Sequence, residues 1–499
     1  MNKLKKYTCL AAALAVGFAA FSCDDDDEVA VTETPTVTTV PEGNVMALVT
    51  TVYRTRDLTV DTVEFSTKDN MAPTNIYLDP STLYQEIDGF GVGITGSTCY
   101  NLLMMTSEDR AEFLKETFDP DQFGFSYVRV SIGCSDFSMS DYTCCDTEGI
   151  ENFALTDEEY DLVIPILQEI LAINPDLKIM GSPWTAPVWM KVSDLDSLEP
   201  YTDFAGGYLN PAYYDDYATY FVKWIQAFKA EGIDIYSITP QNEPLSTSNS
   251  SAMYMGWEQQ RDFIAGYLGP QFVANGITTK IYVYDHNYDY EEISSELNYP
   301  TNIYADADAS QYVAGAAFHN YGGDASELLN VQAAYPGKEL VFSEASIGTW
   351  NDGRDLTERL MDDMEEIALT TVQNYCRGVI VWNLMLDSDG SPYLEGGCST
   401  CYGAVDISNT DYKTITRNSH YYIIAHMASV IKPDAVRIGT TGYTDDNFTY
   451  AAFENTDGTY AFVIVNGYDD TQRITVTSDD KHFAYDLPGY SVTSFRWEK

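Results

Sequence analysis

From residue 88 onward, short apolar stretches alternate along the chain with longer stretches whose apolar residues recur at helical spacing. The short stretches have the length and composition of buried strands. They predict strands at residues 89–94, 127–132, 178–183, 235–239, 280–284, 314–319, 340–343 and 378–383. Eight strands that alternate with helices are the repeat of a (β/α)8 TIM barrel. We therefore predict an α/β fold built on this barrel.

Several of the intervening helices carry terminal signals. Thr156 and Glu159 form a capping box before a predicted helix at residues 160–173. Aromatic residues between positions 217 and 228 recur at helical spacing, and Gly232 predicts the end of that helix. Two further helices are predicted at residues 361–375 and 421–431.

After residue 432 the pattern changes to short strands separated by turn residues. These strands are predicted at residues 448–453, 460–465, 472–476, 481–487 and 491–497. They predict a small all-β domain, and the Val- and Thr-rich segment before the barrel is expected to join it. The predicted domains are residues 45–84 and 432–499, which together form the all-β domain, and residues 85–431, which form the barrel.

The N-terminus resembles an export signal, with three lysines before an apolar run at residues 10–21 that is too short to span a bilayer comfortably. Cys23 follows, as in a bacterial lipobox, where this cysteine is lipidated, and residues 24–28 resemble the acidic export tag of Bacteroidetes lipoproteins. We expect a lipoprotein signal peptide at 1–22, an acidic flexible tether at 23–44, and a place at the outer membrane or cell surface of a Gram-negative bacterium. The alternative is an ordinary cleaved signal in which Cys23 has no role.

The formal net charge of −49 repels nucleic acid and anionic membranes. It favours neutral partners such as uncharged glycans, with membrane contact only through a lipid anchor. Of nine cysteines, seven remain once Cys9 and Cys23 are set aside, and Cys398 and Cys401 have CxxC spacing. A zinc site would need a second spaced pair, so disulfides or buried thiols are favoured. We expect neither a metal nor another cofactor.

Two acidic residues stand where a barrel places its chemistry. Active sites of TIM barrels lie at the C-terminal ends of the strands. Glu243 follows the fourth predicted strand and Glu344 the seventh. Two facing carboxylates can cleave a glycosidic bond, with retention when about 5–5.5 Å apart and with inversion when about 6.5–9.5 Å apart. Taken singly, each glutamate could instead form a structural salt bridge.

These residues, together with others, resemble glycoside hydrolase clan A and, more closely, family 30, the glucosylceramidase-like enzymes. Asn242-Glu243-Pro244 and Glu344 match the clan signature. The other matching segments are Asp88-Gly89-Phe90-Gly91, Arg129-Val130-Ser131-Ile132, Ser135-Asp136-Phe137-Ser138, Ser182-Pro183-Trp184-Thr185-Ala186-Pro187, Trp189-Met190-Lys191, Phe318-His319-Asn320-Tyr321, Ser343-Glu344-Ala345 and Trp382-Asn383-Leu384. The resemblance extends from about residue 75 to residue 499. It implies that the all-β domain is a β-sandwich beside the barrel.

The resemblance also implies hydrolysis of β-linked sugars with retention, with Glu243 as the acid/base and Glu344 as the nucleophile. Arg129 matches the cation that keeps the nucleophile ionised, since a nearby cation lowers a carboxylate pKa. Asn242 matches the residue that contacts the sugar 2-hydroxyl. The other implied substrate contacts are Asp136, Trp184, His319, Tyr321 and Trp382, with Trp382 as a platform under the bound ring. Core packing is the alternative for each tryptophan, and a structural role for His319.

The family contains several specificities, and the chain resembles most closely the endo-β-1,6-glucanase branch. The alternatives are a β-glucosidase or glucosylceramidase, a β-xylosidase, and a surface glycan-binding protein without catalysis. The loop at residues 387–401 carries no Arg or Lys, which argues against a site for glucuronic acid. The sequence Gly91-x-Gly93-x-x-Gly96 has a dinucleotide-binding spacing, but it belongs to the first predicted barrel strand and its loop. The expected substrate is a β-glucan oligosaccharide or polysaccharide.

Overall fold

The computed structural model describes residues 39–66, 72–288 and 293–499. The predicted signal peptide, Cys23 and the tether up to residue 38 lie outside the described residues. Within the described parts of the chain, no helix is long and apolar enough to cross a membrane.

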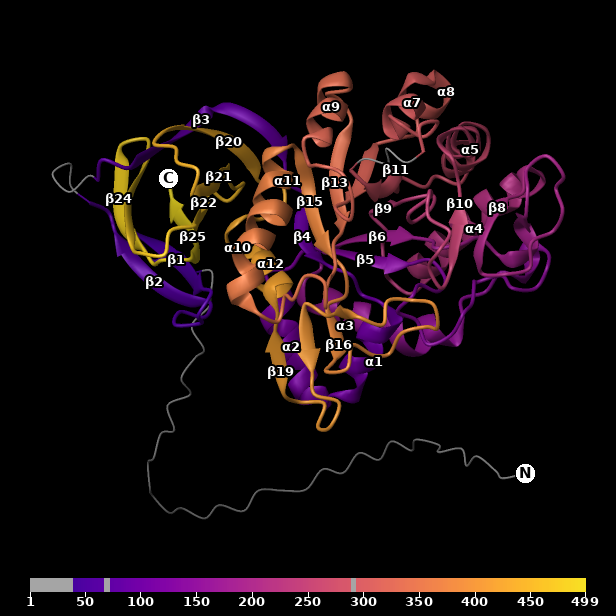
Figure 1. The fold of residues 1–499 in the computed structure, drawn as a ribbon, viewed down its shortest axis with the longest axis horizontal. Helices are drawn as coiled ribbons and strands as arrows, with labels where there is room; N and C mark the ends of the chain where they lie inside the picture. Colours follow the sequence, from indigo (N-terminus) through magenta and orange to yellow (C-terminus); the bar gives the residue numbers. More distant parts are fainter. Residues whose placement is uncertain (1–38, 67–71, 289–292) are drawn as a thin grey trace, which may run out of the picture. The chain divides into compact units, whose positions relative to one another are not determined.

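Eight parallel strands form the barrel, in the order β4-β15-β13-β12-β11-β9-β6-β5 (Figure 1). A parallel bridge between Gly93 and Arg129 joins the two outer strands and closes the barrel. All eight predicted strands are confirmed: β4 (Gly89–Val92), β5 (Tyr127–Ser131), β6 (Lys178–Ser182), β9 (Ser237–Ile238), β11 (Lys280–Asn287), β12 (Gly315–His319), β13 (Glu339–Glu344) and β15 (Cys376–Val381).

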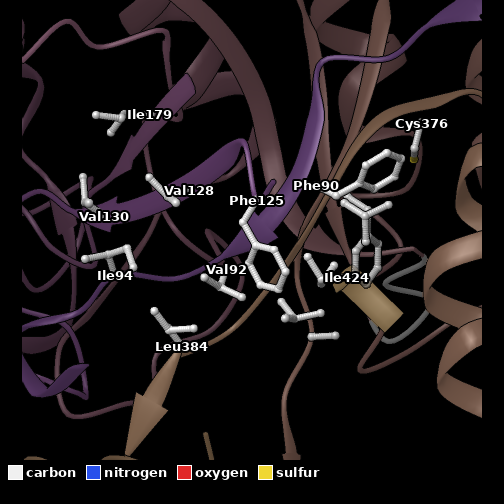
Figure 2. Close-up of a cluster of buried hydrophobic side chains, with 14 of the residues drawn as sticks. Phe90, Val92, Ile94, Phe125, Val128, Val130, Ile179, Cys376, Leu384 and Ile424 are labelled. Atoms are coloured by element: carbon white, nitrogen blue, oxygen red, sulfur yellow. The ribbon is translucent and has the colours of Figure 1, made fainter. Parts of the chain in front are cut away.

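Side chains alternate between the two faces of the barrel strands. Figure 2 shows Phe90, Val92, Val128 and Val130 among the residues of the large core outside the barrel, with Ile424 from a covering helix. The alternate residues form a separate cluster in the barrel interior: Tyr127, Met180, Tyr282, Ala317, Val341 and Ile380. Burial of each large apolar side chain contributes about 1.5–3 kcal/mol. This alternation also turns Arg129 toward the barrel axis.

Two glycines of β4 and its loop are required by close packing rather than by a ligand. A Cβ atom on Gly91 would lie 2.0 Å from the carbonyl oxygen of Tyr127. A Cβ atom on Gly93 would lie 2.6 Å from the indole ring of Trp382. The dinucleotide-like spacing therefore reflects the tight contact between neighbouring strands.

The helices connect the strands and cover the barrel (Figure 1). The capping box is confirmed: the backbone N–H of Thr156 donates to the Glu159 carboxylate at 2.7 Å. The helix it opens begins as a π-helical turn, η3 (Glu159–Val163), and continues as α3 (Ile164–Ile173). The others are α1 (Gly96–Met104), α2 (Ser107–Phe118), α4 (Tyr214–Ala230), α5 (Trp257–Phe263), η6 (Ile264–Leu268), α6 (Gly269–Ala274), α7 (Tyr299–Ala305), α8 (Ala307–Ser310), α9 (Glu327–Ala334), α10 (Leu356–Asp363), η7 (Met364–Leu369), α11 (Thr370–Gln373) and α12 (Ser419–Val430), with short 3-10 turns η2 (Ile150–Asn152), η4 (Val188–Met190) and η5 (Pro211–Tyr213).

A second, nine-stranded sheet forms the β-sandwich, in the order β2-β1-β25-β22-β21-β20-β3-β23-β24. Its strands are β1 (Asn44–Thr51), β2 (Thr59–Glu64), β3 (Asn75–Glu86), β20 (Val436–Gly442), β21 (Phe448–Glu454), β22 (Thr459–Asn466), β23 (Gln472–Ser478), β24 (Lys481–Leu487) and β25 (Ser491–Glu498). Strand β1 pairs antiparallel with β25, so segments from opposite ends of the sequence lie side by side, as the indigo and yellow strands in Figure 1 show. The strands before the barrel therefore join the sandwich, as predicted, and β20 is an additional strand.

Three small sheets lie in the loops of the barrel: β7 (Lys191–Val192) with β8 (Ala205–Leu209) and β10 (Ala252–Tyr254), β14 (Ile347–Gly348) with β17 (Cys401–Tyr402), and β16 (Met385–Asp387) with β18 (Val405–Ile407) and β19 (Ile415–Arg417). Cys398 and Cys401 form a disulfide. The remaining described cysteines are buried thiols: Cys99, Cys134, Cys144, Cys145 and Cys376. The CxxC motif is thus a disulfide, one of the two outcomes expected from the spacing.

Candidate active site

Glu243 and Glu344 meet at the mouth of the barrel. Glu344 is the last residue of β13, and Glu243 lies in the loop that follows β9. A carboxylate oxygen of Glu243, one of Glu344 and a ring nitrogen of His319 all lie within 4.8 Å of one another. Two carboxyl groups whose facing oxygens lie within this distance agree with the spacing of about 5–5.5 Å in retaining glycosidases better than with the spacing of about 6.5–9.5 Å in inverting ones.

The Arg129 guanidinium lies beneath this pair and is completely buried. Its Nη1 donates to Glu344 Oε2 at 2.5 Å. Its Nη2 donates to Asn242 Oδ1 and to Asp285 Oδ2, each at 2.7 Å. The planar guanidinium therefore holds one candidate catalytic carboxylate and orients the Asn242 amide, whose Nδ2 remains as the donor for a ligand.

Asp285, at the end of β11, was missed by the sequence analysis although it anchors the site. Besides Arg129, its carboxylate accepts hydrogen bonds from Thr239 Oγ1 at 2.7 Å and from Ser343 Oγ at 2.6 Å. Burial alone would raise the pKa of Asp285, but the Arg129 charge and the donated hydrogen bonds lower it below its usual range. The signal was present, because Asp285 directly follows the apolar stretch 280–284 just as Glu344 follows its own strand.

Irregular backbone at the strand ends aims these side chains. The register of β11 against β12 shifts between Tyr284 and His286, and Tyr284 and Asp285 have φ values of 74° and 64°. A second shift separates Phe318 from His319 in the pairing of β12 with β13. Bulges of this kind re-aim a side chain next to an active site, and positive φ at a non-glycine residue costs about 1–3 kcal/mol.

His319 links Asp285 to the glutamate pair. Its Nε2 lies 3.0 Å from Asp285 Oδ1, and its Nδ1 lies 3.3 Å from Glu243 Oε1. Burial opposes a charge on the ring, but Glu344, Asp285 and Glu243 outweigh it and raise the pKa of His319 to about 9. The imidazole is therefore protonated at neutral pH and donates from both nitrogens. This gives His319 a structural and electrostatic role beside the reacting groups.

The two glutamates titrate as one pair. Burial raises the pKa of Glu344, and the charge of Glu243 adds to this effect, whereas His319 and Arg129 act in the opposite direction. Burial also disfavours the ionised form of Glu243, but its hydrogen bond with His319 and the positive charge of nearby histidines outweigh burial and lower its pKa. Two carboxylates this close share protons, so their ionisation belongs to the pair.

Tyr321 is at once bound to the site and open to solvent. Its hydroxyl donates to Glu344 Oε1 at 2.9 Å and lies 2.9 Å from the Ser346 hydroxyl. The side chain is nevertheless 42% exposed. Tyr321 and Arg129 thus hold the two oxygens of the Glu344 carboxylate from opposite directions, as expected if this carboxylate must keep one orientation.

Asp136 is a buried carboxylate with an unused oxygen. Its Oδ1 has no hydrogen-bond partner among the described residues. Burial and the charges of Glu344 and Glu243 raise the pKa of Asp136 to about 8, against a hydrogen bond from the backbone of Cys398. At neutral pH the group is a neutral acid that can both donate to and accept from a sugar hydroxyl, which fits the role that the family resemblance implies.

Trp184 and Trp382 flank Arg129. Their rings stack on each other at 5.1 Å, and the guanidinium carbon lies 5.0 and 5.4 Å from the two ring centres. Each tryptophan is only 2% exposed. Cation–π contacts of this kind hold the guanidinium plane in place. The structure therefore assigns both rings to the wall around Arg129, and a platform role for Trp382 stays a prediction.

All the residues expected at the site are therefore brought together, with Asp285 as the unexpected centre. The loop at residues 387–401 also reaches it, because the backbone N–H of Leu394 donates to the Asp136 carbonyl oxygen at 2.8 Å. Glu243, His319 and Glu344 are close enough to hold a cation. However, metal ligands must be deprotonated, and His319 is charged at neutral pH.

Comparisons with known proteins agree with this geometry. The pattern of the Glycosyl hydrolase family 30 TIM-barrel domain matches residues 87–431, and that of the Glycosyl hydrolase family 30 beta sandwich domain matches residues 434–495. The endo-1,6-beta-D-glucanase BGN16.3 of Trichoderma harzianum is 33% identical over 84% of this chain and 85% of its own. Endo-1,6-beta-D-glucanase neg1 of Aspergillus fumigatus is 31% identical over 82% of this chain and 85% of its own.

A solved structure, that of the endo-β1,6-glucanase BT3312, is 65% identical in sequence. It matches with a TM-score of 0.90 over 92% of this chain and 100% of its own. The family patterns together cover the barrel and the sandwich, and the paired carboxylates lie where the chemistry of such enzymes requires them. The chain belongs to glycosyl hydrolase family 30.

Proposed function

We propose that this chain is a retaining endo-β-1,6-glucanase in which Glu344 is the nucleophile and Glu243 the acid/base. One observation carries the mechanism: two carboxylates lie within 4.8 Å at the barrel mouth, and one of them is held by a buried arginine. The close approach of the two carboxylates favours direct attack by one of them over activation of a water between carboxylate and sugar.

In the first step Glu344 attacks the anomeric carbon while Glu243 gives its proton to the glycosidic oxygen. The carbon–oxygen bond breaks, one glucan fragment leaves as an alcohol, and the other is joined to Glu344 as an ester. Arg129 and Tyr321 hold the attacking carboxylate, since each binds one of its oxygens. In the free site the pKa of Glu344 is raised and that of Glu243 is lowered, so the shared proton favours Glu344, and it must move to Glu243 before the attack.

In the second step Glu243 takes a proton from a water, which attacks the same carbon and releases Glu344. Two inversions give net retention. Asn242 is positioned by Arg129 to contact the sugar 2-hydroxyl, and Asp136 offers its unused oxygen to another hydroxyl. His319 keeps a positive charge beside both carboxylates and so limits their mutual repulsion.

The substrate assignment rests on likeness and on charge. The relatives with 31%, 33% and 65% identity all carry the name endo-1,6-β-glucanase. The loop at residues 387–401, which reaches Asp136, contains no Arg or Lys that would select an acidic sugar. A neutral β-glucan therefore fits this site better than glucuronoxylan.

Purified protein should be incubated with pustulan, laminarin, xylan and aryl β-glucosides. We expect a ladder of β-1,6-linked oligosaccharides from pustulan, with the first-formed reducing ends in the β configuration by NMR. Cleavage of xylan but not of pustulan would contradict the substrate assignment. Glu344→Gln should lose activity and keep binding. Near-zero activity of wild type and Glu344→Gln alike, with intact binding, would favour a glycan-binding protein.

We also propose that the chain is exported and anchored through a lipid on Cys23, since an apolar run and an acidic segment flank this cysteine. Palmitate labelling in a Bacteroidetes host should mark the wild type and not Cys23→Ala. An unlabelled wild type that is released in soluble form would contradict the anchor without touching the enzymatic proposal.

A further inference from the structure

Trp350 is an exposed aromatic residue in the loop that follows Glu344. It lies beyond β14, at the turn of a tight hairpin closed by hydrogen bonds of 3.1 Å in both directions between the backbones of Gly348 and Asn351. The side chain is 49% exposed, whereas Glu344 is 6% exposed. The hairpin therefore starts beside the buried nucleophile and carries its indole outward to the rim of the barrel mouth.

The indole ring is held by the backbone beneath it. A Cβ atom added to Gly348 would lie 2.3 Å from the Trp350 ring and 2.4 Å from the carbonyl oxygen of Thr400. The ring thus packs against Gly348, where only a glycine leaves room for it. A ring supported in this way can bind a ligand with little further loss of side-chain entropy.

The hairpin is braced by the disulfide-closed turn. Strand β14 pairs with β17, which places Gly348 opposite Cys401. The backbone N–H of Thr349 donates to the carbonyl oxygen of Thr400 at 3.0 Å, and Thr400 lies between the two cysteines of the disulfide. The position of Trp350 therefore depends on a segment whose own ends are covalently joined.

The same disulfide-closed turn contacts the centre of the site. A Cβ atom on Gly397, which directly precedes Cys398, would lie 2.8 Å from Cβ of Asp136, and the backbone N–H of Leu394 donates to the Asp136 carbonyl oxygen at 2.8 Å. One braced segment thus contacts a buried sugar-binding candidate on one side and the Trp350 hairpin on the other. This arrangement sets the place of Trp350 relative to a glucan chain that enters the site.

We propose that Trp350 is a stacking platform for a glucosyl unit of the β-glucan outside the unit that Glu344 attacks. The proposal rests on the proposed endo-glucanase function, because only a polymeric substrate extends to the rim. The flat apolar ring with its polar N–H suits the apolar face and the hydroxyl edge of a glucose ring. A neutral glucan needs no cationic partner there, which agrees with the absence of Arg and Lys from the 387–401 loop.

The test compares wild type, Trp350→Ala and Trp350→Phe on β-1,6-linked gluco-oligosaccharides of increasing length and on pustulan. We expect kcat/KM of Trp350→Ala to match wild type on chains too short to reach the rim, and to fall about 5- to 10-fold on longer chains, as loss of one stacking contact implies. Trp350→Phe should recover most of this loss. Tyr53→Ala, which removes another exposed aromatic, is the control and should match wild type throughout.

A binding measurement separates this proposal from the proposed function. Glu344→Gln and the double variant Glu344→Gln/Trp350→Ala are compared by affinity electrophoresis in pustulan, where no turnover is needed. We expect weaker retardation of the double variant. Equal retardation, or a loss of kcat/KM that is the same for every chain length, would overturn the platform. A wild type that binds pustulan without cleaving it would overturn the endo-glucanase assignment alone.

Discussion

Asp285 accepts a hydrogen bond from Arg129 at 2.7 Å, and both side chains are completely buried. Neither residue is one of the proposed catalytic glutamates, yet this pair fixes the position of both. Arg129 reaches Glu344, and Asp285 reaches Glu243 through His319. The pair therefore connects the floor of the barrel mouth to the reacting groups.

We expect Asp285→Asn to reduce both stability and turnover. Removal of one partner from a buried ion pair costs up to about 3–5 kcal/mol, and Arg129 would keep only Glu344 as an ionic partner. A displacement of Arg129 by about 1 Å should lower kcat on the order of 100-fold. Urea denaturation and initial rates check both. Asp234→Asn, which breaks an exposed pair with Lys229, is the control and should change stability by less than about 1 kcal/mol.

The charge on His319 predicts a loss of stability at alkaline pH. Its folded-state pKa of about 9 is above the unfolded value of about 6.5, so its contribution is complete below pH 6.5 and disappears as the pH rises through 9. We expect the free energy of unfolding to fall by on the order of 2 kcal/mol more in wild type than in His319→Gln between pH 6.5 and 10. Parallel curves for the two proteins would mean that His319 is neutral in the folded state.

The ionisation of Asp136 predicts how steeply activity falls at alkaline pH. Its pKa of about 8 makes it a neutral hydrogen-bonding acid at pH 7, and its ionisation above pH 8 adds a negative charge beside both glutamates. Asp136→Asn, which imitates the neutral acid, should keep part of the activity and show a shallower alkaline limb. Asp136→Ala should lose about 10- to 100-fold in kcat/KM, since a sugar hydroxyl is left unpaired. If the asparagine variant has the alkaline limb of wild type, Asp136 does not titrate there.

The acid/base role of Glu243 predicts a dependence on the leaving group. Glu243→Gln cannot protonate the departing oxygen, but aryl glycosides with acidic phenols need little protonation. We expect the rate loss on dinitrophenyl glycosides to be much smaller than on β-1,6-linked oligosaccharides. Glu344→Gln is the matched comparison and should lose activity on both. An equal loss with good and poor leaving groups would contradict the assignment of Glu243.

Metal removal should leave the activity unchanged. The oxygens of Glu344 are bound by Arg129 and Tyr321, and the charged His319 offers no lone pair to a cation. Dialysis against EDTA, followed by assay on pustulan, is therefore expected to give the untreated rate within error. Loss of activity that a divalent cation restores would show that the Glu243, His319 and Glu344 cluster binds a metal.

The amino-acid sequence by itself determined the barrel, the sandwich and the two glutamates. All eight predicted barrel strands occur, because a buried strand needs a short apolar stretch and a covering helix needs apolar residues at helical spacing. Glu243 and Glu344 could be recognised because each directly follows such a strand. The disulfide between Cys398 and Cys401 was one of the outcomes that the CxxC spacing left open.

Only the tertiary structure decided how these residues act together. The distance between the two glutamates depends on the closure of the barrel, which no local pattern encodes. The register shifts near Asp285 and His319 turn their side chains into the site, and a shift in register leaves no mark in hydrophobic periodicity. The hydrogen bonds around Asp285 and the braced hairpin of Trp350 join segments that are far apart in sequence. They therefore become visible only when the chain is folded.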